Sequence, residues 1–360
     1  MQKNTKASDM KGKPVERTEN CRVCNERTGE FLADVDYWNI KTSRLVKCTK
    51  CNHIQLDPML SESESAKGCY AYYLEEALRT TPKEQMANCL RNFRRGVVFG
   101  YSLKRRKIFP RSVLELGPGL GYFSVGLKFV FPGADIAVMD INAELASFNE
   151  DHHNYRSIHG VPDIFMPEFK GTFDLVIARD VIEHVNEISA VIENINRYLT
   201  PGGYFHFITP NGREDAWRSY LTSLFTNSSS ELLINHVNYY DGKGLGKLLF
   251  QKGFIPVDYY TYKIKTTLSG LGWKKNKKLM SPVSVRKDAD LLIRENAMEV
   301  SGAGLVKEKI LNKWYIQDRA KWITATYSLY QHFNMIRINP GLNIGHEIYG
   351  LFQKAQHISL

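Results

Sequence analysis

A predicted strand, a glycine-rich turn and the start of a helix follow one another in residues 113–124. The turn has the spacing GxGxG, from three alternating glycines: Gly117, Gly119 and Gly121. Glycine lets the backbone turn sharply and approach a ligand closely, because no Cβ intrudes. Asp140 ends the next apolar run, 19 residues after Gly121, where a carboxylate can accept hydrogen bonds from both ribose hydroxyls. Together these features predict a binding site for a nucleotide-type cofactor.

The pattern around this turn predicts an α/β fold. Apolar runs rich in β-branched and aromatic residues predict strands at 112–116, 136–140, 173–178 and 204–209. Amphipathic segments lie between them, including a predicted helix over 187–199 that the sequence Thr-Pro-Gly-Gly should end. Strands that alternate with helices favour a doubly wound, mostly parallel sheet. Further strands are expected at 254–260 and 345–354.

The glycine turn differs from the GxGxxG fingerprint of dinucleotide-binding proteins. With Glu115 before it, the turn resembles the ExGxGxG motif of class I S-adenosylmethionine-dependent methyltransferases. The resemblance covers roughly residues 105–262 and continues through 173–185 and 199–211. It implies a seven-stranded Rossmann-like methyltransferase sheet with S-adenosyl-L-methionine as cofactor. The cofactor-binding residues that it implies are Glu115, Gly117, Gly119, Gly121, Asp140, Asp163 and Asp180.

Asp180, Glu183 and His184 follow the predicted strand at 173–178. Their spacing of i, i+3 and i+4 would place all three on one face of a helical turn. Two carboxylates and an imidazole can bind a divalent metal, act as acid and base, contact substrate or cofactor, or simply pack and cap. Residues 180–185 resemble the matching stretch of quinone-pathway O-methyltransferases, some of which bind a metal there. They are also similar to the same stretch in many relatives that have no known metal.

The cysteine spacing predicts a structural zinc site. Two CxxC pairs, Cys21 with Cys24 and Cys48 with Cys51, are separated by 23 residues. Four thiolates in two knuckles suit a closed tetrahedral zinc, which leaves no open position for catalysis. The two remaining cysteines, Cys69 and Cys89, are expected to be ordinary small core residues.

The zinc lobe together with the cofactor motif resembles methyltransferases of sugar, surface-polysaccharide and natural-product pathways. In the deoxysugar C-methyltransferases of this group, a Tyr-His-Glu-His-x-x-Tyr-Phe stretch is catalytic; the matching residues here are 233–240. His236 is retained, but Leu233 and Asn235 replace the Tyr and Glu, which argues against C-methylation. His236 can instead deprotonate a hydroxyl, or serve only as a structural hydrogen-bonding residue. The candidate catalytic residues are His236, His184 and Glu183.

The formal charge of +10 is concentrated near the C-terminus, since residues 261–360 hold 16 Lys and Arg against 7 Asp and Glu. This segment contains a lysine cluster at 274–278 and an aromatic, helix-forming stretch at about 305–335. The purely structural interpretation is that the lysine cluster is a solvated loop and the aromatic stretch a helical lid that packs on the core. A sugar phosphate, a nucleic acid or a membrane surface are the alternative partners.

Six segments describe the expected organisation: a mobile tail at 1–20, the zinc lobe at 21–60, a helical linker or substrate region at 61–110, the methyltransferase core at 111–262, a basic aromatic helical insertion at 263–340 and a closing strand with the C-terminus at 341–360. No run approaches the roughly 18–20 apolar residues of a membrane helix. The first twenty residues lack the apolar core of a secretory signal, so we expect a cytoplasmic protein.

The leading functional hypothesis is methyl transfer from S-adenosylmethionine to a hydroxyl of a small-molecule or sugar/glycan acceptor. An RNA methyltransferase is the main rival enzyme, although residues 1–60 are nearly neutral, with 11 Lys and Arg against 8 Asp and Glu. The third hypothesis is a non-catalytic zinc-binding interaction module that has kept the cofactor fold. The sequence names neither the acceptor nor the oligomeric state.

Overall fold

The structure is a computed structural model that describes residues 14–37, 40–61, 63–65, 67–68, 82–212, 214–216, 232–234, 236–263, 337–342 and 344–356. The chain divides into two compact units: one is Met1–Gly68, Val161–Leu279 and Met335–Leu360, and the other is Cys69–Gly160 and Met280–Asn334. The core expected at 111–262 is therefore divided between them. Most of the expected tail and insertion, and the helix at 305–335, lie outside the described residues.

The unit that carries the glycine turn is built of parallel strands and helices. Its elements are α2 (Pro82–Arg105), β5 (Ser112–Leu116), α3 (Tyr122–Val130), β6 (Asp135–Asp140), α4 (Ala143–His153) and β7 (Arg156–His159). Strand β6 pairs in parallel with both β5 and β7. The β5 residues are buried from Val113 to Leu116, as expected for a strand covered on both faces.

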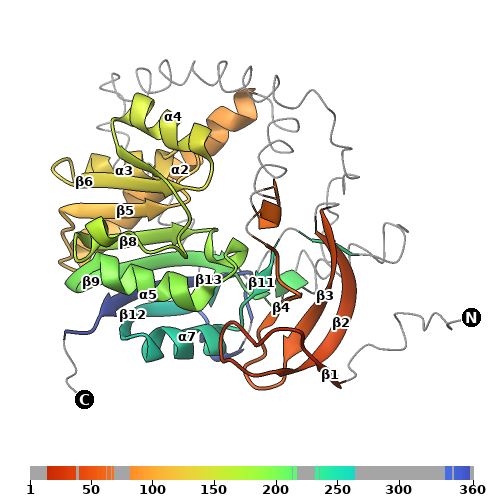
Figure 1. Ribbon diagram of the computed structural model, residues 1–360. Helices are drawn as coiled ribbons and strands as arrows, with labels where there is room; N and C mark the ends of the chain where they lie inside the picture. Colours follow the sequence, from red (N-terminus) through yellow and green to blue (C-terminus); the bar gives the residue numbers. More distant parts are fainter. Residues whose placement is uncertain are drawn as a thin grey trace, which may run out of the picture. The chain divides into compact units, whose positions relative to one another are not determined.

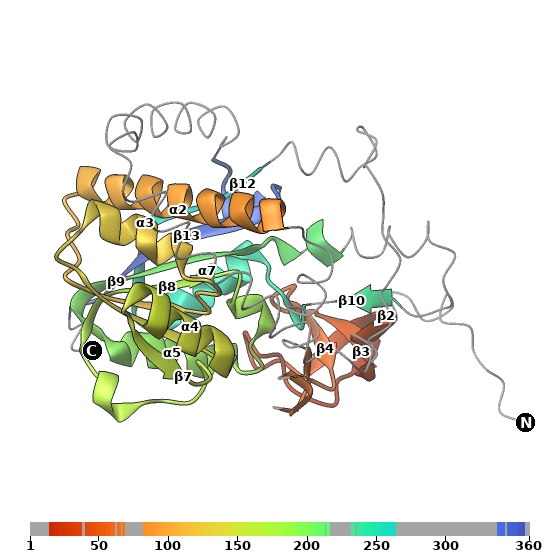
Figure 2. The ribbon, with the colours of Figure 1, turned by 90° about the horizontal axis from the view of Figure 1, so that it is seen from above.

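Helices α2 and α3 run alongside each other at close range (Figure 2). Two glycines permit this contact. A Cβ on Gly96 would lie 2.0 Å from the Phe123 carbonyl oxygen, and a Cβ on Gly126 would lie 2.0 Å from the Phe93 carbonyl oxygen. At each glycine the missing side chain leaves room for the backbone of the other helix. This contact anchors α3, the helix that follows the glycine turn.

Gly126→Ala should therefore destabilise the protein by about 1–3 kcal/mol, because the methyl group must push α2 away from α3. The measurement is the urea midpoint followed by circular dichroism. Gly133→Ala is the matched control, since a Cβ there meets no atom within 4 Å. Equal midpoints for the two variants would contradict the close packing.

The other unit supplies strands β8 (Phe173–Arg179), β9 (Leu199–Pro210), β12 (Phe254–Tyr262) and β13 (Glu347–Lys354). Strands β8 and β9 are parallel, whereas β13 is antiparallel to both β9 and β12. The seven strands follow the order β12-β13-β9-β8-β5-β6-β7, which confirms the predicted α/β methyltransferase-type sheet (Figure 1). Helices α5 (Ile188–Tyr198) and α7 (Gly242–Gln251) belong to the same unit as these four strands.

The predicted helix over 187–199 is confirmed as α5, which ends at Tyr198, just before the Thr-Pro-Gly-Gly sequence. Strand β9 begins at Leu199, so the Thr-Pro-Gly-Gly sequence lies within the strand. Gly202 adopts a φ of 77°, which glycine tolerates without strain. The register between β8 and β9 also shifts between Phe173 and Leu175, so the glycines accommodate an irregular start of the strand.

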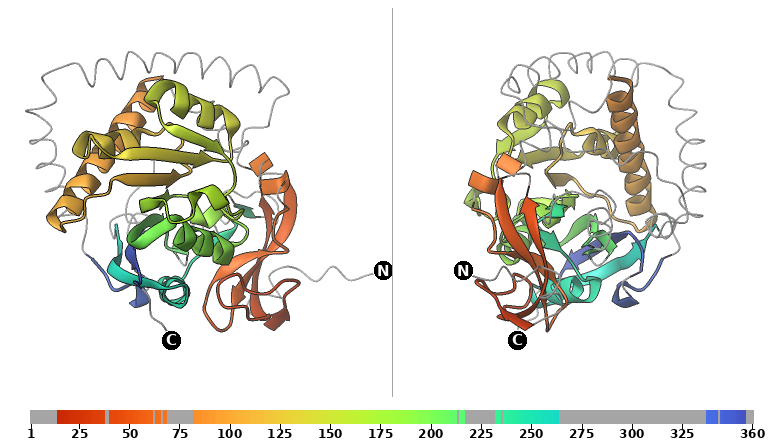
Figure 3. Two further views of the ribbon diagram at one scale, coloured as in Figure 1. Left: turned by 60° about the vertical axis from the view of Figure 1, so that its left-hand side comes forward. Right: turned by 90° about the vertical axis from the view of Figure 1, so that its right-hand side faces the viewer.

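The N-terminal lobe is a six-stranded sheet and exceeds the expected boundaries of 21–60. Its strands are β1 (Pro14–Glu16), β2 (Thr28–Tyr37), β3 (Lys41–Cys48), β4 (Ile54–Asp57), β10 (Leu232–Ile234) and β11 (Asn238–Tyr239). Figure 3 shows the long strands β2 and β3 curving together. Val237 and Tyr239 pack into the lobe's buried core with Val35 and Leu56. A segment distant in sequence thus completes the lobe.

Among the described residues, no helix has the length and apolar character that a membrane crossing requires.

Candidate functional site

The glycine turn lies between β5 and α3, as the sequence predicts. All three glycines have positive φ: 60° at Gly117, 55° at Gly119 and 71° at Gly121. Side chains rarely adopt this region, because Cβ collides with the backbone. A Cβ on Gly119 would meet no atom within 4 Å, so the backbone there faces open space. The turn can therefore receive a ligand against bare main chain.

Helix α4 holds the turn in place through two residues that sequence reasoning missed. The Asn149 side-chain amide donates to the Gly119 carbonyl oxygen at 2.8 Å, and His153 Nε2 lies 2.9 Å from the Leu120 carbonyl oxygen. A Cβ on Gly121 would lie 1.9 Å from Asn149 Oδ1, so this glycine is also required for packing. Neither Asn149 nor His153 belongs to a recognisable motif, because their role depends on how α4 crosses the turn.

Glu115 is buried within β5, with 3% of its surface exposed. The Ser124 hydroxyl on α3 donates a hydrogen bond to its carboxylate. The described contacts thus support a role in joining the strand to the helix after the turn. A direct role of Glu115 in cofactor binding stays a prediction.

Asp140 ends β6 and is 3% exposed. One carboxylate oxygen, Oδ1, accepts a hydrogen bond from the Asn142 backbone amide at 2.9 Å. The other oxygen, Oδ2, is buried and has no hydrogen-bond partner among the described residues. A buried acceptor without a partner costs free energy, which a ligand hydroxyl would recover. Asp140 therefore suits the predicted ribose contact.

The protonation of Asp140 makes this contact dependent on pH. Burial raises the pKa of the Asp140 carboxyl to about 6, although hydrogen bonds from backbone amides act in the opposite direction. A ligand that donates hydrogen bonds favours the ionised carboxylate and lowers the pKa in the complex. Cofactor affinity should therefore be constant well above pH 6 and should decrease as the pH falls below it.

Asp140→Asn should weaken binding of S-adenosylmethionine by about 10- to 100-fold, because hydrogen bonds to a charged group contribute roughly 1.5–3 kcal/mol. The measurement is calorimetric titration between pH 5 and pH 8. The variant should also lose the decrease in affinity below pH 6. Asp135→Asn, at the other end of β6, is the control and should bind as the unmodified protein does. Unchanged affinity in Asp140→Asn would remove Asp140 from the site.

The structure describes Asp163 without testing its predicted contact with the adenine. It is half-buried and follows β7, and its charge helps to raise the pKa of Glu187. Its role in cofactor binding stays a prediction.

The expected helical turn over 180–184 is wrong. A 3-10 helix, η3 (Ile182–His184), begins only after Asp180, and Asp180 itself has a φ of 54°. Glu183 points inward and is 2% exposed, whereas Asp180 and His184 are exposed. The three side chains therefore do not share one helical face. The tight left-handed bend after β8 separates Asp180 from the other two.

The structure instead brings Glu183 and His184 together with His236. One ligand-type atom from each lies within 4.8 Å of the others, and the rings of His184 and His236 are 4.9 Å apart. The Thr209 hydroxyl donates to Glu183 Oε2 at 3.0 Å. Burial raises the pKa of Glu183 to about 8, although the charge of His236 opposes this. Burial thus favours the protonated form of Glu183.

A further carboxylate, Asp215, was missed from the sequence. Its Oδ2 lies 2.6 Å from Nδ1 of His236, and the two side chains are 18% and 12% exposed. Asp215 comes just after β9, whereas His236 precedes β11. Because no motif spans their separation of 21 residues, only the fold pairs them. The three candidate catalytic residues thus form one cluster with an additional acceptor.

The four cysteines converge, as the two CxxC pairs predict. Their sulfur atoms lie within 4.8 Å of one another, and the contacts Cys21–Cys51 and Cys24–Cys48 are both 3.5 Å. Zinc–sulfur bonds of about 2.3 Å in a tetrahedron place sulfur atoms about 3.8 Å apart, so the cluster fits zinc with little adjustment. All four are free cysteines rather than disulfides.

The backbone repeats the same turn at both pairs. Asn25 and Asn52 follow the second cysteine of each pair and adopt φ values of 61° and 59°. Their amides donate to the carbonyl oxygens of Cys21 at 2.8 Å and of Cys48 at 3.1 Å. Two identical knuckles that aim four sulfur atoms at one point support a closed structural site.

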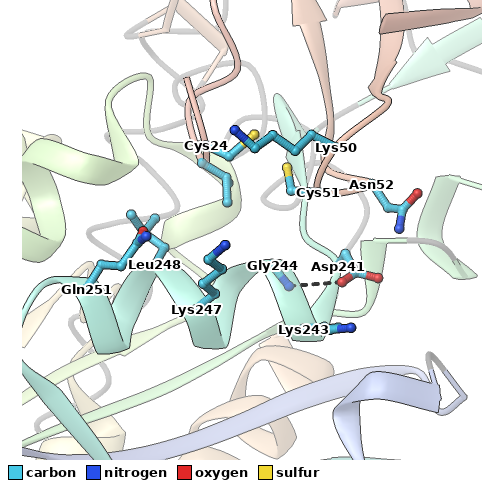
Figure 4. A pocket seen from close by; sticks show the side chains of 11 residues that line it. Cys24, Lys50, Cys51, Asn52, Asp241, Lys243, Gly244, Lys247, Leu248 and Gln251 are labelled. Atoms are coloured by element: carbon cyan, nitrogen blue, oxygen red, sulfur yellow. Dashed lines mark hydrogen bonds between the residues drawn. The ribbon is translucent and has the colours of Figure 1, made fainter. Parts of the chain in front are cut away.

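A cavity of about 340 Å³ lies between this cluster and α7 (Figure 4). Cys24 and Cys51 contribute to its wall, and Asp241 caps α7 by accepting a hydrogen bond from the Gly244 amide at 2.9 Å. Its wall also contains three lysines: Lys50, Lys243 and Lys247. A zinc ion with four thiolates carries a net charge of −2, which these ammonium groups would complement.

Removing one ligand should therefore remove the metal. We expect about one zinc per chain in the intact protein, less than half of that in Cys51→Ser, and a lower melting temperature for the variant, because zinc binding contributes to folding of such lobes. Metal analysis and thermal unfolding are the measurements. Cys89→Ala is the control, since Cys89 lies outside the cluster. A full zinc content in Cys51→Ser would refute the site.

The fold and the glycine turn with its buried carboxylate define the class of the protein as that of Rossmann-like methyltransferases. The sequence matches the methyltransferase-domain family over residues 75–258, just over half of the chain. The chain therefore belongs to this family. The family and the fold support S-adenosylmethionine as the cofactor.

Individual relatives match over shorter stretches. The chain is 32% identical over 110 residues to a malonyl-[acyl-carrier protein] O-methyltransferase of Legionella pneumophila. The matched stretch covers 30% of this chain and 39% of the relative. It is 25% identical over 118 residues to a ubiquinone biosynthesis O-methyltransferase of Proteus mirabilis, which covers 31% and 46%. The match thus spans less than half the length of either relative. The solved structure of a SAM-dependent methyltransferase from Aquifex aeolicus has a TM-score of 0.33 and 15% identity, over 42% of this chain and 76% of that one.

Proposed function

We propose that this protein transfers a methyl group from S-adenosylmethionine to an oxygen atom of a small-molecule or sugar/glycan acceptor. The observation that carries the proposal is the buried Asp140 oxygen without a partner in the unit that holds the bare glycine turn. Gly117, Gly119 and Gly121 would approach the cofactor through their backbone, and Asp140 would bind its ribose.

Oxygen is the favoured acceptor atom for two reasons. Both similar proteins named above are O-methyltransferases by their printed names. The cluster of His236, His184 and Glu183 also provides a base, which an un-ionised hydroxyl needs when it attacks a methyl group. Neither reason names the acceptor molecule, so the acceptor must be found by screening.

When bound, S-adenosylmethionine supplies a methyl group already activated on a sulfonium. The protein's part is then to align the acceptor oxygen and to take its proton. His236 would accept this proton, because it is partly buried and lies against the carboxylate of Asp215. Burial of Glu183 favours its protonated form, which would compete less for the proton than an ionised carboxylate.

The experiment is a transfer assay with radiolabelled S-adenosylmethionine and the zinc-loaded protein. Nucleotide sugars, phenols, acyl-carrier thioesters and bulk RNA are presented separately. Label in a methyl ether, which is stable to alkali, or in a methyl ester, which is not, supports the proposal, and the ether alone indicates a hydroxyl acceptor. Label in RNA favours the rival RNA methyltransferase, and cofactor binding without transfer to any acceptor favours the non-catalytic module.

His236→Asn should lower kcat by roughly 10²- to 10⁴-fold, because it removes the base, and it should leave affinity for S-adenosylmethionine unchanged. The nearby carboxylates raise the pKa of His236 despite the opposing effect of burial. The rate of the unmodified protein should therefore rise with pH through this raised pKa, and the variant should lose this rise. His346→Asn, at a histidine that faces Glu214, is the control. Equal rates for both variants would remove His236 from catalysis.

A further inference from the structure

Backbone hydrogen bonds to the residue that follows β9 support Asp215 in the position from which it meets His236. Its backbone amide donates to the Asn211 carbonyl oxygen at 2.9 Å, and Asn211 follows β9 directly. The Asn211 backbone and side-chain amides donate in turn to the carbonyl oxygens of His346 and Gly345, both at 2.8 Å. Asp215 therefore occupies a fixed position at the end of a core strand.

The contact between Asp215 and His236 determines the tautomer of the imidazole. An ionised carboxylate only accepts hydrogen bonds, so at 2.6 Å from Asp215 the Nδ1 atom of His236 must carry the hydrogen. In the neutral ring the lone pair is then on Nε2. In solution the other tautomer, with hydrogen on Nε2, is ordinarily preferred, so the carboxylate selects the ring form that can accept a proton at Nε2.

We infer that Asp215 is the positioning residue that makes His236 a proton acceptor through Nε2, and that the acceptor of the methyl group is consequently a neutral hydroxyl. The inference rests on the proposed function. During transfer the hydroxyl oxygen forms a bond to the methyl carbon as the carbon–sulfur bond breaks, and the bonding electrons stay on sulfur as a neutral thioether. The hydroxyl proton goes to Nε2 of His236, and the resulting imidazolium is stabilised by Asp215.

The charges around His236 agree with this role. Five titratable side chains face or neighbour it: Asp215 after β9, Asp180, Glu183 and His184 at the bend after β8, and Tyr239 in β11. Burial lowers the pKa of His236, whereas the hydrogen bond and charge of Asp215 raise it, followed by the charges of Glu183 and Asp180. Asp215 is thus the main group that offsets burial.

The same pair discriminates between two kinds of oxygen acceptor. A hydroxyl remains protonated at neutral pH and must lose its proton on methylation, whereas a carboxylate is already ionised and needs no base. A base positioned by a half-buried carboxylate adds nothing to the methylation of an acceptor that is already ionised. The Asp215–His236 pair therefore favours a hydroxyl over a carboxyl group as the methylated site.

Nitrogen NMR of ¹⁵N-histidine-labelled, full-length, zinc-loaded protein tests the inference without any methyl transfer. His236→Gln assigns the resonances. We expect the neutral ring to be protonated at Nδ1 and its pKa to be above 6.5. Asp215→Asn should lower the pKa of His236 and allow the Nε2-protonated form, while Asp215→Glu should largely restore the original signature. Glu214→Gln is the matched control, because Glu214 neighbours Asp215 but faces His346.

Three results would overturn the inference. One is an Nε2-protonated ring in the unmodified protein, which requires no variant to fold. Another is an equal shift in Asp215→Asn and Glu214→Gln. The third is selective paramagnetic broadening of His236 Nε2 by added Mn²⁺, because a nitrogen coordinated by a metal cannot accept a proton. An intact pair in a protein that methylates no hydroxyl would instead count against the proposed function.

Discussion

One short segment, residues 236–240, is hydrogen-bonded on two sides, and both the lobe and the candidate site depend on it. Towards the lobe, the Leu56 amide donates to the Val237 carbonyl oxygen at 3.1 Å, and buried His53 bonds to the Asn238 side chain at 3.1 Å. Towards the bend after β8, the Val237 amide donates to the Glu183 carbonyl oxygen at 3.1 Å, and Asn238 donates to that of Val185 at 2.6 Å. Leaving such buried groups unpaired costs roughly 1–3 kcal/mol each. The N-terminal lobe therefore also supports the position of His236, which lies between its strands β10 and β11.

The cofactor half of the site was predictable from the sequence because its chemistry is local. Gly117, Gly119 and Gly121 need positive φ within one turn, and Asp140 ends the very next strand, so a single βαβ unit places all four. The convergence of the four cysteines was predictable for the same reason, since each pair is fixed by one turn of backbone. The apolar runs predicted the bounds of β5, β6 and β8 to within one residue, because buried strands of a parallel sheet appear in the sequence as continuous apolar runs.

The residues that sequence reasoning missed all contact residues that are far from them in the sequence. Asn149 supports the turn from another helix, and Asp215 meets His236 only because the residues after β9 come next to those before β11 in the same unit. The helical face expected for Asp180, Glu183 and His184 was wrong because spacing alone does not reveal the left-handed bend at Asp180. The lobe boundaries were too narrow for a similar reason, since β10 and β11 join its sheet from far along the chain. Local motifs thus indicate which chemical groups a site contains, and tertiary contacts determine which side chains lie together in it.

The environments of three carboxyl groups suggest how the charge of the proposed reaction is managed. Burial raises the pKa of Asp140 to about 6 and that of Glu183 to about 8, so the protonated form is favoured more at Glu183 than at Asp140. Asp215 is the carboxyl group in hydrogen-bond contact with His236. Methyl transfer to a hydroxyl converts a positive sulfonium into a neutral thioether and moves a proton, with its positive charge, to the base. The carboxylate of Asp215 would balance the charge of the protonated His236, because the two groups are in hydrogen-bond contact.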